Sequence, residues 1–455
     1  MVRRPLNPPA AGTSLTLRER EWEILAAHLF RDGDEHGAVI LAEVSAGPRG
    51  LRLLGRQVVL ARDGVDYVPG RYGYRALHPD FVRDQAVLAR EAGLAYIAVH
   101  NHQGGIRVAF SRVDLASHER GYPALLEIVD NIVGGLVCTP LAASGDVWLP
   151  GGGRENLAEL VVAGHVIRRL RPTPHYSNGV EGLYERQALL FGSAGQECFR
   201  EMRVAIVGQG GAGSILSEQL ARLGVGHFTL VDDDVVDVTN LPRLVGSVRS
   251  DVGMPKVEVG RDVILKANPD ASVLALQLRM EDLGAREAVG QVDHIFLAAD
   301  GNGARHWVNA IVERSLIPGV QVGVKVPVSD SGDVGMIHSV VRPLVPGLGC
   351  LWCNALIDPT ELAIDLQPDS EARRQARYVS GVDAPSVMSL NSLAVSMAVT
   401  DFMLGVTDLL ATTNGEYRLE FPRGRVTESI VRRRSASCPW CGDAQATTVP
   451  IDQQL

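Results

Sequence analysis

A glycine-rich stretch at residues 203–226, RVAIVGQGGAGSILSEQLARLGVG, decides the fold of the larger part of this chain. The apolar run RVAIV has the length of a buried strand, and the segment after the glycines has the length of a helix. Between them lie Gly208, Gly210, Gly211 and Gly213, where backbone amides at a helix start can approach phosphate oxygens. The pattern predicts a strand–turn–helix unit that binds a nucleotide, either a dinucleotide or ATP.

Further apolar runs follow at spacings that leave room for helices: HFTLV, SVLALQL, HIFLA and GVQVGV. Short continuous runs separated by helix-length segments are typical of a parallel sheet that is covered on both faces. We therefore expect an α/β, Rossmann-like domain with a mostly parallel sheet, followed by a helix near 389–404 and a strand near 416–419.

Charged and amide side chains lie at the ends of these strands and in the following loops. They are carried by LVDDDVVDVTNLPRL at 230–244, GMPKVE at 253–258 and LAADGN at 297–302. A dehydrogenase needs no arginine and lysine at this place, but attack of a carboxylate on the α-phosphate of ATP does, because negative charge develops on the phosphates. The residues expected around the nucleotide are Asp232, Asp234, Asn240, Arg243, Lys256 and Asp300.

From Tyr184 to about Leu404 the chain resembles the ThiF/MoeB/ubiquitin-activating family of adenylating enzymes. The resemblance rests on GQGGAG, DDDVVDVTNLPR, GMPK, the ANP at 267–269, AADGN, and YERQALLFGSAGQE at 184–197. It implies an enzyme that converts ATP and the C-terminal carboxylate of a ubiquitin-like or sulfur-carrier-like protein into an acyl-adenylate and pyrophosphate.

The resemblance also implies residue roles. The glycine turn wraps the ATP phosphates, Asp232 binds the ribose and Asp300 positions Mg²⁺. Arg186, in YERQ, matches an arginine that the family supplies from a partner subunit, which implies a homodimer. The side chains implied to contact the phosphates and to stabilise the transition state are Asn240, Arg243 and Lys256.

Many relatives carry a catalytic cysteine in a crossover segment. The corresponding segment here, QARYVSGVDAPSV at 375–387, has none. Two hypotheses stay open: the enzyme stops at the adenylate and a partner nucleophile attacks it, or Ser380 or Ser386 forms an oxyester.

Four of the six cysteines form two C-x-x-C pairs, which in a cytosolic chain indicate metal binding. Four thiolates make a closed, structural Zn²⁺ site with no open position for catalysis. The alternative is two unrelated reduced pairs or a redox centre. The predicted zinc ligands are Cys350, Cys353, Cys438 and Cys441.

A second candidate metal site lies in the N-terminal part, in AYIAVHNHQGGIRVAFSRVD at 95–114. His100 and His102 alternate at a strand end, so both side chains point to one side, and Asp114 at the next helix start completes three ligands. Three ligands with an open fourth position are typical of catalytic zinc, which lowers the pKa of bound water to about 7. Ser111 is the expected donor to an oxyanion.

The same segment resembles the JAMM (JAB/MPN+) metallopeptidase motif. The spacer between His102 and Ser111 is one residue longer than usual, and Gln103 replaces a common proline. The general base that the motif requires upstream is Glu35, with Glu43 as the alternative. The competing interpretation is a degenerate domain that only binds.

These patterns divide the 455 residues into five parts: a leader (1–17), a JAB/JAMM-like α/β domain (18–170), a linker (171–182), the adenylation domain (183–441) and a tail (442–455). A net charge of −9 argues against a general nucleic-acid binder. The chain has no run of 18 apolar residues, so we expect no transmembrane helix. We expect a cytoplasmic enzyme that works with ATP, Mg²⁺ and Zn²⁺, and a conjugating enzyme is a possible partner. The alternative substrates are a ribosomal peptide or a sulfur carrier for cofactor synthesis, and a third hypothesis is a scaffold without activity.

Overall fold

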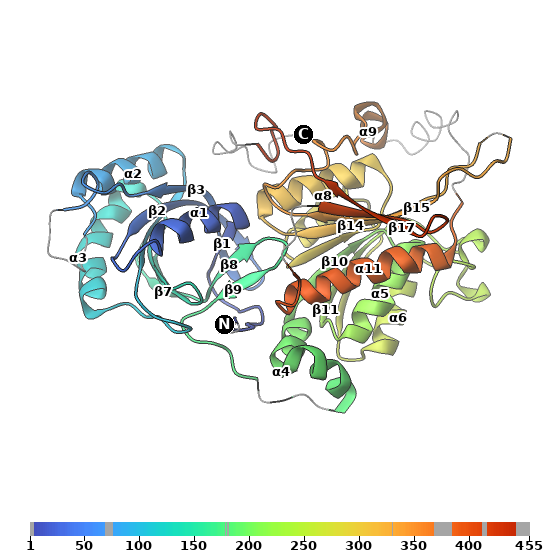
Figure 1. Cartoon of the computed structure of the whole chain (residues 1–455), viewed down its shortest axis with the longest axis horizontal. Coiled ribbons are helices and arrows are strands. Elements are labelled where there is room, and N and C mark those ends of the chain that lie inside the picture. Colours follow the sequence, from blue (N-terminus) through green and yellow to red (C-terminus); the bar gives the residue numbers. More distant parts are fainter. Residues whose placement is uncertain are drawn as a thin grey trace. The chain divides into compact units, whose positions relative to one another are not determined.

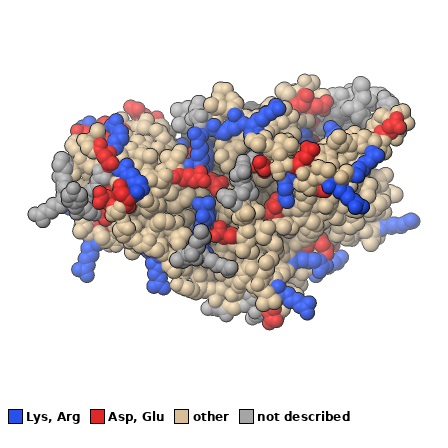
Figure 2. Space-filling model, in the orientation of Figure 1, with Lys and Arg blue, Asp and Glu red and all other residues tan. Residues whose placement is uncertain are grey.

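The computed structural model describes residues 4–68, 76–177, 179, 182–329, 331–367, 385–411 and 416–442. The chain divides into two compact units between residues 178 and 179 (Figure 1). This boundary falls inside the segment 171–182 that the sequence predicts as a linker. Basic side chains on the face in Figure 2 stand among acidic and uncharged ones.

The first unit is built on one mixed sheet of nine strands, in the order β7-β6-β5-β4-β2-β3-β1-β8-β9. The strands are β1 (Ser14–Arg18), β2 (Gly37–Gly47), β3 (Gly50–Leu60), β4 (Ala95–Asn101), β5 (Val133–Cys138), β6 (Ala143–Trp148), β7 (Arg154–Leu157), β8 (Glu159–Ala163) and β9 (Arg168–Leu170). The helices are α1 (Glu19–Leu29), α2 (Pro79–Glu91) and α3 (Arg112–Val129).

Alternation along β2 explains why helices cover both faces of this sheet. Ala38 and Ile40 pack into the same cluster as the buried side chains of α1, whereas Val39 and Leu41 pack into the cluster that contains residues of α2 and α3. Successive side chains of a strand point to opposite faces, so a continuous apolar run such as GAVILA is buried on both sides.

One boundary expectation is wrong. Residues 14–17, assigned from the sequence to a loose leader, belong to β1, which lies in the interior of the sheet and pairs with β3 and β8. Leu15 and Leu17 are fully buried. The leader was assigned from its composition, but SLTLR alternates apolar and polar residues, as a half-buried strand does.

The second unit has an eight-stranded sheet in the order β12-β11-β10-β13-β14-β15-β16-β17. Its strands are β10 (Arg203–Val207), β11 (His227–Val231), β12 (Ser272–Leu276), β13 (His294–Leu297), β14 (Gly319–Lys325), β15 (His338–Leu344), β16 (Glu416–Phe421) and β17 (Val426–Val431). The first five are parallel, as the apolar runs predict, and the last three are antiparallel.

Helices cover both faces of this sheet as well (Figure 1). The α-helices of the unit are α4 (Glu185–Glu201), α5 (Gly211–Leu223), α6 (Lys256–Ala267), α7 (Leu283–Val289), α8 (Asn302–Ser315), α9 (Pro359–Asp365) and α11 (Met388–Val406). Short 3₁₀ turns are η1 (Gly182–Tyr184), η2 (Val238–Asn240) and η3 (Arg249–Asp251). The order of the strands reverses between β10 and β13, and in open α/β sheets ligands bind at the carboxyl ends of the strands at such a point.

Helix α11 is long and apolar enough to cross a membrane by composition, and it is the one such helix among the described residues. It packs against α5, β14 and β15, and it buries Ala394, Val395, Ala398 and Phe402. These contacts are those of a helix that belongs to the core of the second unit.

Candidate functional site

The glycine turn joins β10 to α5 at the point where the strand order reverses. Gly208 has a φ of +92°, which favours glycine, and a Cβ there would lie 2.7 Å from the amide nitrogen of Ala299. A Cβ on Gly213 would lie 1.8 Å from the carbonyl oxygen of Gly208. A Cβ on Gly210 would meet nothing within 4 Å. Packing thus requires glycine at 208 and 213, while the space beside Gly210, the residue that precedes α5, is open.

Asp232 follows β11 and is tied to the glycine turn. Its carboxylate accepts hydrogen bonds from the backbone amides of Gln209 (2.5 Å) and Asp234 (2.9 Å). Burial raises the pKa of Asp232, and nearby Lys256 acts in the opposite direction. The Nζ of Lys256 lies 2.6 Å from the carboxylate of Asp234.

Arg243 lies over the start of α5. Its guanidinium donates to the carbonyl of Thr239 at 2.7 Å, and its Cδ is 3.4 Å from the place that a Cβ of Gly211 would occupy. Asn240 lies one turn earlier, where its side-chain oxygen accepts the backbone amide of Asp237 at 3.2 Å. The arginine is therefore held beside the glycine turn.

Asp300 is exposed in the loop between β13 and α8. The two residues that precede Asp300 in this loop lie against Gly208, so the backbone of Asp300 lies close to the glycine turn. Asp300 also interacts electrostatically with Arg305. Burial lowers the pKa of Arg305 below its usual value, and the charges of Asp300 and Asp365 partly oppose this shift.

The remaining predicted residues of the adenylation site are Arg186 and the two candidate acceptor serines. Arg186 is exposed at the start of α4 and has no hydrogen-bond or ion-pair partner among the described residues. Ser380 lies outside the described residues. Ser386 is described, and its hydroxyl accepts a hydrogen bond from Asn391 at 3.1 Å.

Asn391 is a residue of this site that the sequence did not reveal. It is buried on α11, and its amide nitrogen is 2.4 Å from the place that a Cβ of Gly211 would occupy. The asparagine therefore lies directly against the start of α5. No motif surrounds it in the sequence, and it is far from the glycines along the chain, so only the fold connects them.

The four cysteines of the C-x-x-C pairs converge in the second unit. The sulfur of Cys350 is 3.6 Å from that of Cys438, and the sulfur of Cys353 is 3.5 Å from that of Cys441. All four lie within 4.8 Å of one another. Zn–S bonds of about 2.3 Å in a tetrahedron place sulfurs about 3.8 Å apart, so the donor set fits one zinc ion. Trp352 and Trp440 pack against the sulfurs.

In the first unit the two histidines and the aspartate also converge. The Nε2 atoms of His100 and His102 are 3.3 Å apart, and the Oδ2 of Asp114 is 3.5 and 3.4 Å from them. Tetrahedral ligands with bonds of about 2.0–2.1 Å stand about 3.3 Å apart. The three atoms therefore have the spacing of one face of a zinc tetrahedron.

Asp114 is fixed by the helix that carries it. Its carboxylate accepts the amide of Ser111 at 2.7 Å, and its own amide donates to the Ser111 hydroxyl at 3.2 Å. This reciprocal pair caps α3 and still leaves the hydroxyl its proton to donate. Burial opposes ionisation of Asp114, but the hydrogen bonds from His100 and Ser111 and the charge of His100 together outweigh it, so the pKa of Asp114 lies below its usual range.

Glu35 and Glu43 differ sharply in their surroundings. Burial raises the pKa of Glu35, and the imidazoles of His100 and His102 act in the opposite direction, so its carboxyl is electrostatically coupled to the metal-ligand cluster. Glu43 is ion-paired with Arg56 at 2.7 Å. Gly37 pairs with His100, and Glu43 lies six residues further along the same strand. At about 3.3 Å per residue, Glu43 is therefore about 20 Å from the residue that pairs with His100.

Comparisons with known proteins match the second unit. The model of the ThiF family matches residues 184–440. The sulfur carrier protein ThiS adenylyltransferase of Escherichia coli (strain K12) is 29% identical over 269 residues, covering 58% of this chain and 97% of that enzyme. The SAMP-activating enzyme E1 of Haloferax volcanii is 35% identical over 172 residues, 37% of this chain and 60% of that protein. A crystal structure of E. coli MccB with MccA-N7isoASN has 24% identity and a TM-score of 0.48, and covers 58% of this chain and 76% of that one.

Proposed function

This chain belongs to the ThiF family, and we propose that residues 183–441 adenylate the C-terminal carboxylate of a ubiquitin-like or sulfur-carrier-like protein. The observation that carries the proposal is the convergence of Asp232, Lys256 and Arg243 around the glycine turn at the carboxyl ends of β10 and β11. Relatives that adenylate a sulfur carrier support the choice of substrate class.

Each group has a role in this reaction. The open side of Gly210 lets phosphates approach the amides at the start of α5, where the helix dipole favours negative charge. The substrate carboxylate attacks the α-phosphorus, a new C–O–P linkage forms, and pyrophosphate leaves with the electrons of the broken P–O bond. Lys256 and Arg243 stabilise the charge on the phosphates in the transition state.

Mg²⁺ fits the carboxylates at the ends of β11 and β13, because it binds through one or two carboxylates together with substrate phosphates. Asp234 and Asp300 are exposed oxygen donors next to the turn. The ion would neutralise phosphate charge when bound. We propose further that Arg186 acts across a homodimer, and that the exposed Leu189 and Leu190 beside it on α4 belong to the subunit contact.

For the first unit we propose a JAMM-type zinc peptidase that cleaves an amide or isopeptide bond at the C-terminus of the same modifier. The spacing of the donor atoms of His100, His102 and Asp114 supports zinc. Zinc, when bound, supplies a water of lowered pKa. Glu35 takes a proton and returns it to the leaving amine, and the Ser111 hydroxyl donates to the developing oxyanion.

Both units would then recognise one flexible C-terminal tail, one to activate it and the other to trim or release it. We propose that these reactions take place in the cytoplasm, in a bacterial conjugation pathway with a separate conjugating enzyme. The cysteine-free crossover segment supports transfer from the adenylate to a partner nucleophile, with Ser380 as an alternative acceptor.

The test is intact mass spectrometry of a candidate carrier of about 70–100 residues after incubation with this protein and MgATP. We expect a mass gain of one AMP and release of pyrophosphate, both absent with Lys256→Met. A reaction with short peptides but with no folded carrier would replace the proposed substrate by a ribosomal peptide. Absence of pyrophosphate exchange with either substrate would refute adenylation.

A further inference from the structure

We propose that Asn101, the residue between the two histidine ligands, positions the general base Glu35. The inference rests on the peptidase function proposed above. Asn101 is a positioning residue in this proposal: it does not touch substrate, and it acts through the main chain on both sides of Glu35.

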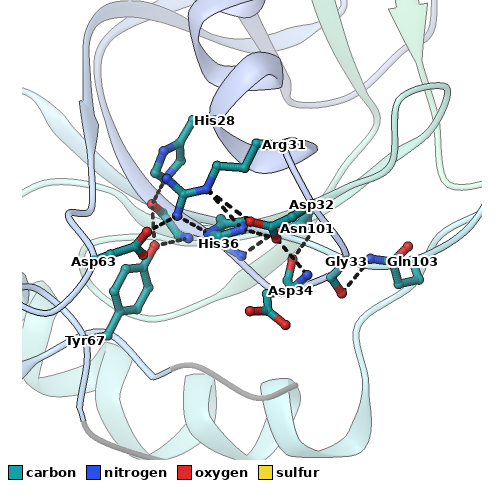
Figure 3. A network of polar contacts seen from close by, with 11 residues as sticks. His28, Arg31, Asp32, Gly33, Asp34, His36, Asp63, Tyr67, Asn101 and Gln103 are labelled. Carbon is teal, nitrogen blue, oxygen red and sulfur yellow. Dashed lines mark hydrogen bonds and ion pairs between the residues drawn. The ribbon is translucent and has the colours of Figure 1, made fainter. Parts of the chain in front are cut away.

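The first observation is the alternation along β4. His100 and His102 are two residues apart, so their side chains share one face, whereas Asn101 and Gln103 point the other way. The Asn101 side chain is 1% exposed. Figure 3 shows Asn101 and Gln103 directed at the loop that leads into β2. One short segment therefore supplies metal ligands on one side and amides on the other.

The second observation is what the Asn101 amide bonds. Its Oδ1 accepts the backbone amide of His36 at 2.6 Å, and its Nδ2 donates to the carbonyl of Asp34 at 3.1 Å. These two bonds straddle Glu35. The β2–β4 ladder ends at the pair of Gly37 and His100. Beyond this pair, the Asn101 side chain supplies the next two hydrogen bonds to the backbone before β2, and Glu35 lies between them.

The rest of the loop is anchored in the same way (Figure 3). Gln103 donates to the carbonyl of Gly33 at 3.0 Å, and the Tyr67 hydroxyl accepts the amide of Gly37 at 2.8 Å. The His36 ring lies between Asp32 (2.7 Å) and Arg31 (2.8 Å). The two Asn101 bonds flank Glu35 on both sides.

Replacing Asn101 by alanine would leave the buried N–H of His36 and the half-buried C=O of Asp34 without this partner, which is costly. The backbone around Glu35 would then move to reach other partners. Partners that orient groups at a metal site typically change activity 10–100-fold when they are lost. The histidine ligands lie on the opposite face of β4, so zinc should stay bound.

The test compares the full-length, zinc-loaded chain with Asn101→Ala and Asn101→Asp. Asn101→Asp keeps the acceptor for His36 but loses the donor to Asp34. We expect kcat for cleavage of a modifier–lysine isopeptide to fall about 10–100-fold in the alanine variant and less in the aspartate variant. KM, zinc content and the absorption spectrum of the Co²⁺-substituted protein should not change. Hydrogen exchange at the His36 amide should accelerate in Asn101→Ala.

The matched control is Asn131→Ala. Asn131 also bonds a backbone carbonyl and a backbone amide, those of Gly93 and Ile132. It precedes the start of β5, whereas His100 pairs with Val137 near the end of that strand. Its loss should leave kcat and exchange at His36 unchanged.

Wild-type kcat in Asn101→Ala, loss of zinc from it, or unchanged exchange at His36 would each overturn the inference alone. If the wild-type chain cleaves no substrate, the peptidase function fails, and the role of Asn101 fails with it.

Discussion

The two glycines at either side of the start of α5 give a prediction that separates packing from ligand binding. In Gly213→Ala the new methyl group would lie 1.8 Å from the carbonyl oxygen of Gly208. Carbon and oxygen atoms that are not bonded need at least about 3 Å, so the turn must open by about 1 Å. In Gly210→Ala the methyl group meets no atom within 4 Å.

The magnitude follows from two opposing effects. Overpacking that forces a backbone shift costs about 1–3 kcal/mol, and alanine gains about 1 kcal/mol over glycine inside a helix. Because the clash is with backbone atoms, we expect the overpacking cost to lie at the top of its range. After the gain from alanine is subtracted, the net loss of stability for Gly213→Ala is about 2 kcal/mol. In a unit of this size that lowers the midpoint of thermal unfolding by about 4–8 °C. Gly210→Ala should change the free energy of unfolding by less than about 0.5 kcal/mol.

The assay is thermal unfolding with and without MgATP, together with calorimetric titration of ATP. Gly210→Ala should unfold like the wild type without ligand, yet bind ATP at least about tenfold more weakly, because its methyl group occupies the path of the phosphates. Gly213→Ala should be weakened in both measurements. Wild-type affinity for ATP in Gly210→Ala would refute the assignment of this turn to the phosphates.

Three further predictions concern the other groups. Asp300→Ala should abolish ATP–pyrophosphate exchange without altering peptidase activity, and loss of both activities in a folded variant would contradict independent sites. Because burial raises the pKa of Asp232, its carboxylate is protonated at a higher pH than that of an ordinary aspartate; ATP affinity titrated downward from pH 7.5 should fall as pH approaches that pKa, and Asp232→Asn should flatten this dependence. Cys438→Ser should remove one zinc equivalent per chain by metal analysis and lower the unfolding midpoint of the second unit, while a variant that keeps its zinc and its midpoint would argue against a four-cysteine site.

Local patterns predicted the parts of the fold in which the pattern and the fold agree. The β10–α5 unit was predicted because a strand, a glycine turn and a helix are contiguous in 203–226. The parallel strands were predicted because burial on both faces produces continuous apolar runs. The antiparallel β15–β17 extension was not fully predicted, since β17 (VTESIV) is exposed along almost its whole length, shows no apolar alternation, and depends on β16 for its pairing.

The candidate sites divide in the same way. Cys350 and Cys353, like His100 and His102, carry their spacing in the sequence, so the pairs were visible, and only the meeting of distant ligands required the fold. Asn391 was invisible because its role depends on contact with Gly211, which lies 180 positions earlier. Residues that act through contacts between distant segments leave no periodic signal.

Asn101 shows why such a residue can still be argued from the structure. An ordinary β-ladder would pair the backbone of residues 34–36 with the strand beside it, and Glu35 would then be one more alternating side chain. Here the ladder ends at Gly37, and a buried side-chain amide bonds the carbonyl before Glu35 and the N–H after it. The cost of leaving those backbone groups unpaired therefore fixes the loop and its carboxyl together. In the proposed peptidase, the strand that carries the candidate zinc ligand His100 and the amide of Asn101 on opposite faces would thus also determine where Glu35 lies. A change at this one buried amide should then affect proton transfer without releasing zinc.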